Sequence, residues 1–343
     1  MSRLPGVPTP ASSPEAPPAA DAAAPGRRPR GAGLPLVTVL IVAAVLLRPV
    51  LTGLLGHPAI ANWATVFVAI TIQALPFLVL GVAVSATIAA FVPPGLIARL
   101  LPKRPALAVP AAAVAGAALP GCECGSVPVA ARLVSIGVTP AAAFAFLLSA
   151  PAINPVVLVS TAVAFPGRPA MVVARFVASL AASVAMGLLW IVLGRDDLIT
   201  PQRSHRTEDG PRLTVFLATA QHDFLQAGGF LVIGAGTAAT LQTLVPRRIV
   251  DSVAGTGPLS LLALGVLAVV VALCSEADAF VAAGLKQFSL TARLAFLVVG
   301  PMVDVKLFAL QAGTFGTRFA WRFSLATFAV AVTCAGLVGW WLL

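Results

Sequence analysis

The sequence predicts an all-α polytopic membrane protein, with about 8–10 transmembrane helices in two halves that contain broken helices. Hydrophobic residues make up 59% of the 343 residues and charged residues 10%, whereas a soluble domain carries about 25% charged residues. Apolar runs long enough to cross a bilayer recur along the chain, and some are interrupted by proline and glycine. This composition excludes a soluble enzyme, a disordered protein and a disulfide scaffold.

The net charge of +10 does not indicate a nucleic-acid partner. The basic residues occur in small groups between long apolar runs, where they can set orientation in the membrane. Four cysteines are too few and too scattered for a disulfide framework. The lipid bilayer is therefore the expected partner, and the chain is expected to be a multi-pass protein of the cell membrane.

Residues 1–33 are expected to form a disordered, Pro/Ala-rich cytoplasmic tail. They hold eight prolines, many alanines and the arginine cluster Arg27, Arg28 and Arg30, a composition that cannot bury a core. A signal peptide is the alternative interpretation. The first apolar run, however, is long enough to span, and no clear A-x-A cleavage site follows it. We therefore expect this run to be the first transmembrane helix.

A spanning helix needs about 20 apolar residues, and several runs meet this length. The candidate spans are 34–55, 63–92, 139–165, 170–193, 214–245, 292–312 and 321–343. Two shorter runs, 106–120 and 258–274, are each followed by a polar, interrupted stretch. The arginine-rich loop 194–213, expected in the cytoplasm, separates a first transmembrane half, 34–193, from a second, 214–343.

The two halves resemble each other in sequence. At an offset of 153 residues, the stretch 73–77 matches 226–230, and Glu123 falls on Glu276. Because the tail and the central loop are both expected in the cytoplasm, equivalent helices should run in opposite directions. This arrangement is the inverted repeat of secondary transporters. The alternative is a low-complexity similarity among alanine, leucine and valine.

The first interruption, 119–128, holds Cys122, Glu123 and Cys124 between prolines and glycines. On a regular helix the two thiols would point about 200° apart, but on an extended backbone side chains two apart share one face. Proline and glycine make such a break possible. A shared dithiol suits a thiophilic ion or a trivalent metalloid better than zinc. The alternative is that both cysteines are small packing residues.

The second interruption, 274–278, keeps the acid but not the dithiol. Glu276 matches Glu123, whereas serine and alanine stand at the positions that match the two cysteines. We therefore hypothesise that Glu123 and Glu276 serve a mechanism shared by both halves, through proton coupling or by holding the broken helices. The thiols would then determine the choice of substrate.

Several charged residues fall within apolar regions. They are Glu123, Glu276, Asp278, Asp304 and Lys306. Each costs at least ~2.5 kcal/mol on membrane-insertion scales, so each needs a partner or a wet cavity. Lys306 can pair with Asp304 or with either glutamate. The functional interpretation is a proton or ion relay, and the alternative is a structural ion pair.

A third interruption lies inside the run 139–165, where the pattern Pro-x-x-Asn-Pro ends at Pro155. Its counterpart in the second half is 301–306, which places Asp304 opposite Asn154. Prolines in this pattern break a helix. Asn154 can then satisfy the freed backbone groups or contact the substrate.

The motifs of the two halves together are specific. They are 120–130 and 150–156 in the first half, and 274–282 and 300–306 in the second. Over about residues 60–343 the chain resembles the ArsP/YraQ-type predicted permease family. The resemblance implies an inner-membrane permease. Some members of the family export trivalent organoarsenicals, with cysteines as ligands. The cysteine motif of the family corresponds here to Cys122 and Cys124, which are therefore the expected metalloid ligands.

The expected function is secondary efflux of a small thiophilic solute, such as a trivalent (organo)arsenical. The candidate substrate-binding residues are Cys122, Cys124, Glu123, Asn154, Glu276, Asp304 and Lys306. Nothing resembles a P-loop, an HExxH or a GxSxG motif, so neither an enzyme nor a cofactor is expected. One alternative is a permease for another solute that works as a homo-oligomer or with a partner subunit, with dispensable cysteines. A membrane thiol–disulfide redox protein is the other alternative.

Overall fold

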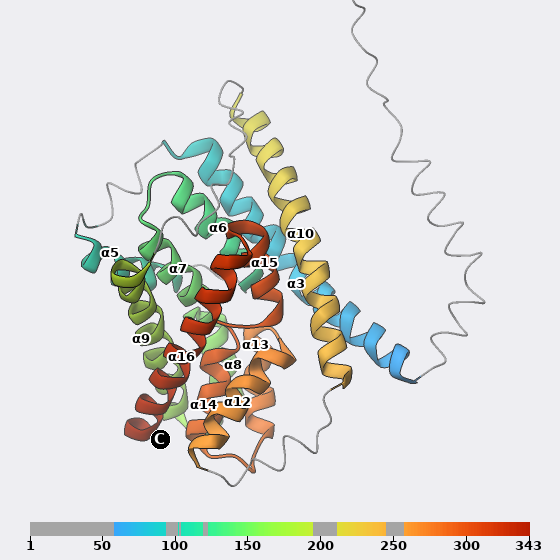
Figure 1. Ribbon diagram of the computed structural model, residues 1–343, viewed down its shortest axis with the longest axis vertical. Helices are drawn as coiled ribbons and strands as arrows, with labels where there is room; N and C mark the ends of the chain where they lie inside the picture. Colours follow the sequence, from blue (N-terminus) through green and yellow to red (C-terminus); the bar gives the residue numbers. More distant parts are fainter. Residues whose placement is uncertain (1–57, 94–101, 103, 119–122, 195–210, 245–256) are drawn as a thin grey trace, which may run out of the picture. The chain divides into compact units, whose positions relative to one another are not determined.

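The computed structural model describes residues 58–93, 102, 104–118, 123–194, 211–244 and 257–343 (Figure 1). Within these ranges every regular element is a helix, which confirms the all-α fold class. The expected tail 1–33, the expected span 34–55 and most of the loop 194–213 lie outside the described residues. Cys122 lies outside them as well.

Long and short helices follow each other in the same order in both halves of the described chain. The first half contains α3 (Pro58–Phe91), α5 (Pro105–Gly116), α6 (Glu123–Ser135), α7 (Pro140–Ile153), α8 (Pro155–Ala164) and α9 (Pro169–Leu193). The second contains α10 (Arg212–Leu244), α12 (Pro258–Val271), α13 (Ser275–Gly284), α14 (Leu290–Val299), α15 (Val305–Phe315) and α16 (Thr317–Leu342). The inverted orientation of the halves remains a prediction.

Five helical segments of the described chain are long and apolar enough to cross a membrane. They are α3, the segment Pro140–Ala164 formed by α7 and α8, α9, Arg212–Thr243 of α10, and α16. A segment of 25 residues is about 37 Å long, which exceeds the bilayer core of about 30 Å. The chain is therefore a multi-pass membrane protein. Helices α5 and α6 have 12 and 13 residues, so neither can cross alone.

The segment formed by α7 and α8 lies at the centre of the helix packing. Of its apolar window, 78% is buried, compared with 28–39% in the other four long segments. The outer helices can leave apolar side chains exposed, because the hydrocarbon of a bilayer is as apolar as leucine. Side chains that must be shielded from lipid are therefore best placed next to α7 and α8.

The central segment breaks at Asn154, as the sequence predicts. Pro155 has no N–H to continue the helix, and Asn154 adopts an extended backbone. Its side-chain oxygen accepts a hydrogen bond from the Val157 N–H at 3.0 Å, and its amide donates to the Ala150 carbonyl at 3.1 Å. Asn154 thus satisfies freed backbone groups on both sides of the break, as an N-cap residue does.

The expected continuous span 292–312 is two helices, α14 and α15. The backbone is interrupted after Val299, and α15 begins at Val305. Asp304 caps α15, because its carboxylate accepts a hydrogen bond from the Leu307 N–H at 2.5 Å. Asp304 therefore has the same local role as Asn154, at the position that the sequence comparison assigns to it.

The helix breaks of one half pack against those of the other. Helix α8 contacts α13, and α15 contacts α6. The long helices of the two halves also pair, since α3 packs along α10 and α9 along α16 (Figure 1). The short helices that follow the interruptions are thus enclosed by long helices from both halves.

An aromatic cluster joins helices of the two halves. The ring of Phe144 in α7 lies 4.9 Å from that of Trp190 in α9 and 4.8 Å from that of Phe319 in α16, measured between centroids. Phe319 is also 5.1 Å from Phe315 in α15. Aromatic pairs at such distances contribute about 0.5–1.5 kcal/mol each beyond the burial of area. These contacts fix α15, the helix that begins beside Asp304, against the central segment.

Helices α3 and α6 approach each other to backbone contact. A Cβ atom on Gly81 would lie 2.3 Å from the Cα atom of Gly125, and one on Gly125 would lie 2.7 Å from the Phe77 carbonyl oxygen. Small residues permit such close approach between membrane helices. Because Gly125 is two residues after Glu123, the contact also fixes the start of α6.

Replacing Gly81 with alanine should destabilise the protein by about 1–3 kcal/mol, because the added methyl group overpacks this contact. Gly229→Ala in α10 is the matched control, since nothing lies within 4 Å of the added Cβ atom. Alanine has the higher helix propensity, so the control should be neutral or more stable by up to about 1 kcal/mol. Thermal unfolding of the two purified variants in detergent compares them. Equal stabilities would contradict the close contact.

Candidate functional site

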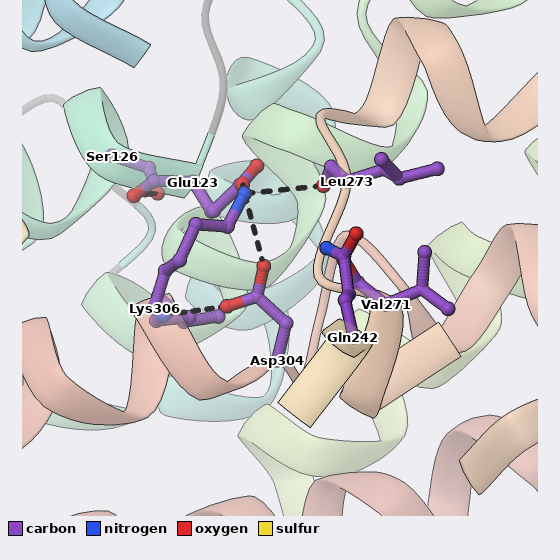
Figure 2. A network of polar contacts seen from close by, with 8 residues as sticks. Glu123, Ser126, Gln242, Val271, Leu273, Asp304 and Lys306 are labelled. Carbon is purple, nitrogen blue, oxygen red and sulfur yellow. Dashed lines mark hydrogen bonds and ion pairs between the residues drawn. The ribbon is translucent and has the colours of Figure 1, made fainter. Parts of the chain in front are cut away.

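Lys306 is the centre of a buried charge cluster at the helix breaks. Its Nζ atom lies 2.8 Å from Oε1 of Glu123 and 3.3 Å from Oδ2 of Asp304. It also donates a hydrogen bond of 3.2 Å to the carbonyl of Leu273, which precedes α13 (Figure 2). The ammonium group thus donates two hydrogen bonds and has a second carboxylate within ion-pair distance. The sequence offered Asp304, Glu123 and Glu276 as partners of Lys306. In the structure, Lys306 pairs with Glu123 and Asp304.

This ion pair is completely enclosed by protein. The side chains of Lys306, Glu123 and Asp304 have no solvent-exposed surface. A charge transferred out of water in this way is stable only with close partners, because desolvation costs several kcal/mol for each ion. Glu123 belongs to the first half and Lys306 to the second, 183 residues later. The pair therefore joins the halves at the interruption that each contains.

Three short helices begin at the cluster. Glu123 is the first residue of α6, Asp304 is the N-cap of α15, and Leu273 lies two residues before α13. The start of a helix carries roughly half a positive charge and unsatisfied N–H groups, which stabilise a nearby carboxylate. Broken helices of secondary transporters present their N-termini to the substrate site in this way.

The turn before α13 directs a carbonyl group at Lys306. Ala272 ends α12 in the left-handed conformation, with a φ of 47°, which is uncommon for a residue other than glycine. Gln242 of α10 donates a hydrogen bond to the carbonyl of the neighbouring Val271 (Figure 2). Local strain of this kind is typical of functional sites. The turn therefore belongs to the cluster, although no sequence motif singled out Gln242 or Ala272.

Arg175 in α9 is a buried cation that the sequence analysis missed. Its guanidinium group donates hydrogen bonds to Thr161 Oγ1 at 2.7 Å and to the Ser275 carbonyl at 3.1 Å. It also interacts electrostatically with Asp278 and Glu276. The available signal was an arginine within the 25-residue apolar segment Pro169–Leu193, because intramembrane charges usually mark a functional site.

Glu276 and Asp278 extend the cluster into the second half. Glu276 interacts electrostatically with Glu123, Arg175 and Lys306. Both of its carboxylate oxygens and Oδ2 of Asp278 are buried, and none has a hydrogen-bonding partner among the described residues. The two glutamates that the predicted repeat pairs with each other therefore belong to one cluster, but only Glu123 has an ion-pair partner among the described residues.

Two thiols lie near Lys306. Cys124 is buried in the first turn of α6, and Cys274 is the N-cap residue of α13. Both interact electrostatically with Lys306. The expected dithiol of Cys122 and Cys124 remains a prediction, since Cys122 lies outside the described residues. Within the described part of the chain, no group of three or more His, Cys, Asp and Glu residues is arranged to hold a metal ion.

The region that contains this cluster matches a known protein family. The family is described as a predicted permease, ArsP_1, and its match covers residues 59–339. The chain belongs to this family. The match includes the described helices of the site, from α6 to α15. The fold and the family together establish a membrane permease, with a buried polar site where its broken helices meet.

Two relatives of this predicted permease support the assignment. The UPF0718 protein YcgR of Bacillus subtilis (strain 168) is 39% identical over 279 residues, which cover 79% of this chain and 94% of the relative. A Streptococcus mutans protein is 33% identical over 268 residues, which cover 75% of this chain and 88% of the relative. The latter is named a putative two-component membrane permease complex subunit. No solved structure matches the chain.

Lys306→Met should destabilise the permease more than Glu123→Gln. The methionine leaves two buried carboxylates without their cation, whereas the glutamine leaves the pair of Lys306 with Asp304 in place. Removal of one partner from a buried ion pair typically costs about 3–5 kcal/mol. Thermal unfolding in detergent measures the order, with Lys286→Met as control because Lys286 is exposed. Equal stability of Lys306→Met and Lys286→Met would contradict the ion pair.

Proposed function

We propose that this permease exports a small thiophilic solute, such as a trivalent organoarsenical, by secondary transport past the charge cluster around Lys306. The observation that carries the proposal is the buried ion pair between Lys306 and Glu123. It joins the helix breaks of the two halves beside the thiol of Cys124. In secondary transporters the substrate site lies near the midplane, where the broken helices of two inverted repeats meet.

The chemistry of the cluster supports a thiophilic substrate. Thiolates are the preferred protein ligands of soft ions. Cys124 lies in the first turn of α6 and interacts electrostatically with Lys306. We assign the binding of the metalloid to Cys122 and Cys124. Asn154 lies at the break in the central segment, where its capping hydrogen bonds would keep the ends of α7 and α8 in position beside the site.

The remaining candidate residues would act on the movement of the helices rather than on the metalloid. Glu123, Asp304 and Lys306 hold the N-termini of α6 and α15 together, so a movement of either helix has to break or replace these contacts. Substrate that reaches the cluster can compete for Lys306 and thereby release the helices. Such a coupling between binding and movement is what alternating access requires.

A second candidate function is transport of another solute by a two-component complex. The relative from Streptococcus mutans is named as a subunit of such a complex, which favours a partner subunit for this chain. In that case the thiols would be packing residues, and the buried carboxylates would bind the solute. The two candidates differ in whether transport requires Cys122 and Cys124.

Arsenic accumulation in cells exposed to methylarsenite separates these functions. A metalloid-sensitive bacterial host would carry empty vector, the wild-type permease or the Cys122→Ser/Cys124→Ser double variant, at matched amounts in the membrane. We expect the wild type to lower accumulation and the double variant to match the empty vector, because serine oxygens are poor ligands for a soft metalloid. Cys334→Ser is the matched control and should export like the wild type.

Two outcomes would overturn parts of the proposal. Export by the double variant at the wild-type rate would exclude the thiols as ligands and shift substrate binding to the carboxylates. A wild type that matches the empty vector would exclude unaided export of this substrate. Co-expression with a candidate partner subunit would then test the two-component function.

A further inference from the structure

The charge cluster contains more carboxyl groups than cations among the described residues. Glu123, Glu276, Asp278 and Asp304 are the acids, and Lys306 and Arg175 are the cations. Unpaired charge is expensive in a membrane interior, so a buried carboxyl group without a partner binds a proton or a cation instead. The question is which of the four groups does so.

Two of the acids have defined charge partners. Glu123 and Asp304 both contact Lys306, at 2.8 and 3.3 Å. Asp304 also accepts the Leu307 N–H at the start of α15. Both contacts stabilise the ionised form of a carboxyl group. These two acids therefore share Lys306 as a cation at contact distance.

Glu276 is less deeply buried than Asp278 and lies nearer the start of α13. It is the second residue of α13, where N–H groups remain unsatisfied and the helix dipole stabilises an anion. Asp278 lies two residues farther along. Its own N–H already donates to the Cys274 carbonyl at 3.1 Å. Asp278 is therefore the acid that receives least help from a helix end.

The surroundings of Asp278 offer its carboxyl oxygen Oδ2 no hydrogen-bond donor among the described residues. The side chain is 2% exposed, and Oδ2 has no hydrogen-bonding partner among the described residues. This oxygen is directed at the backbone of Gly300, where a Cβ atom would lie only 2.5 Å from it. Burial of an ionised oxygen against such a surface costs far more free energy than burial of a neutral carboxylic acid.

The charged groups around Asp278 come from several helices. Of the helices packed against α13, α8 has no titratable residue, and α14 has Arg293, whose guanidinium donates to the Phe288 carbonyl. The groups that act on Asp278 electrostatically are Arg175, Glu123, Lys306 and Asp304. Lys306 is occupied by its own partners. Arg175 remains as the cation. It donates hydrogen bonds to Thr161 and Ser275, and its Nε has no hydrogen-bonding partner among the described residues.

We propose that Asp278 is a proton-binding site, and that the permease couples transport to the release and uptake of this proton. The inference rests on the proposed secondary transport. In the release step the O–H bond of Asp278 breaks, the electron pair stays on the carboxylate, and the proton passes to water on one side of the membrane. Arg175 then balances the new negative charge. Uptake from the other side restores the neutral acid.

Infrared difference spectra of the full-length protein in lipid vesicles test the site without any substrate. A protonated carboxyl group has a C=O stretching band that its ionised form lacks. We expect this band in the wild type at neutral pH, its loss on alkaline titration, and its absence in Asp278→Asn. Asp223→Asn is the matched control, because Asp223 is outside the cluster and pairs with Arg132 at 3.7 Å. Asp278→Glu retains the acid and should shift the band, which covers the case that the asparagine variant misfolds.

The outcomes distinguish this proposal from the proposed export. A wild type without the band at neutral pH, or a band that persists in folded Asp278→Asn and disappears in Glu276→Gln, overturns Asp278 as the proton site. The coupling is tested by methylarsenite accumulation with and without an ionophore that collapses the proton gradient. Export that is unaffected by the ionophore overturns the coupling even if the band is present. A band that behaves as expected in a protein that exports no arsenical leaves the proton site established and refutes only the substrate.

Discussion

The ion pair of Lys306 with Glu123 and Asp304 is the constraint on which the helix breaks depend. In a low-dielectric interior these charges are tolerated only at contact distance, so the starts of α6 and α15 must stay within a few ångströms of each other. The other end of α6 is also tied to the second half, because Arg132 lies 3.7 Å from Asp223 in α10. Helix α6 is therefore held near both ends by charges, and the glycine contact with α3 also fixes its start.

The cluster divides into a fixed part and a part that can change its charge. Lys306 and its two carboxylates form the fixed part, which lies at the starts of short helices. The acids of α13 lie beside it, next to Arg175, and have no ion pair of their own at contact distance among the described residues. Such a division allows one group to gain or lose a proton without a change in the charge of the Lys306 ion pair itself. A transporter needs both properties, because its site must respond to ligands without unfolding.

Much of the fold follows from local patterns in the sequence. The long spans of the described chain and the break at Asn154 were predictable, because apolar length and proline determine them within a few residues. The expected interruption at 119–128 was only partly right, because α6 already begins at Glu123 and places Cys124 in a helical turn. The division of the span 292–312 into two helices was less visible, since its break depends on the cap that Asp304 provides. The sequence left three possible partners for Lys306, and Arg175 escaped notice. In both cases the deciding contacts join residues far apart in the chain. A local sequence pattern does not show which distant residues come into contact.

The way the charges are shared between the halves has a consequence for the biogenesis of the protein. The first half is synthesised first, and it brings Glu123 and Arg175 into the membrane before their partners exist. Lys306 follows Glu123 by 183 residues, and the carbonyl of Ser275 follows Arg175 by 100. Until then the nascent helices carry charges that lipid cannot solvate, so they must stay beside the insertion machinery or at a wet interface. The buried charges of the first half therefore gain these partners only after residues 275 and 306 have been inserted.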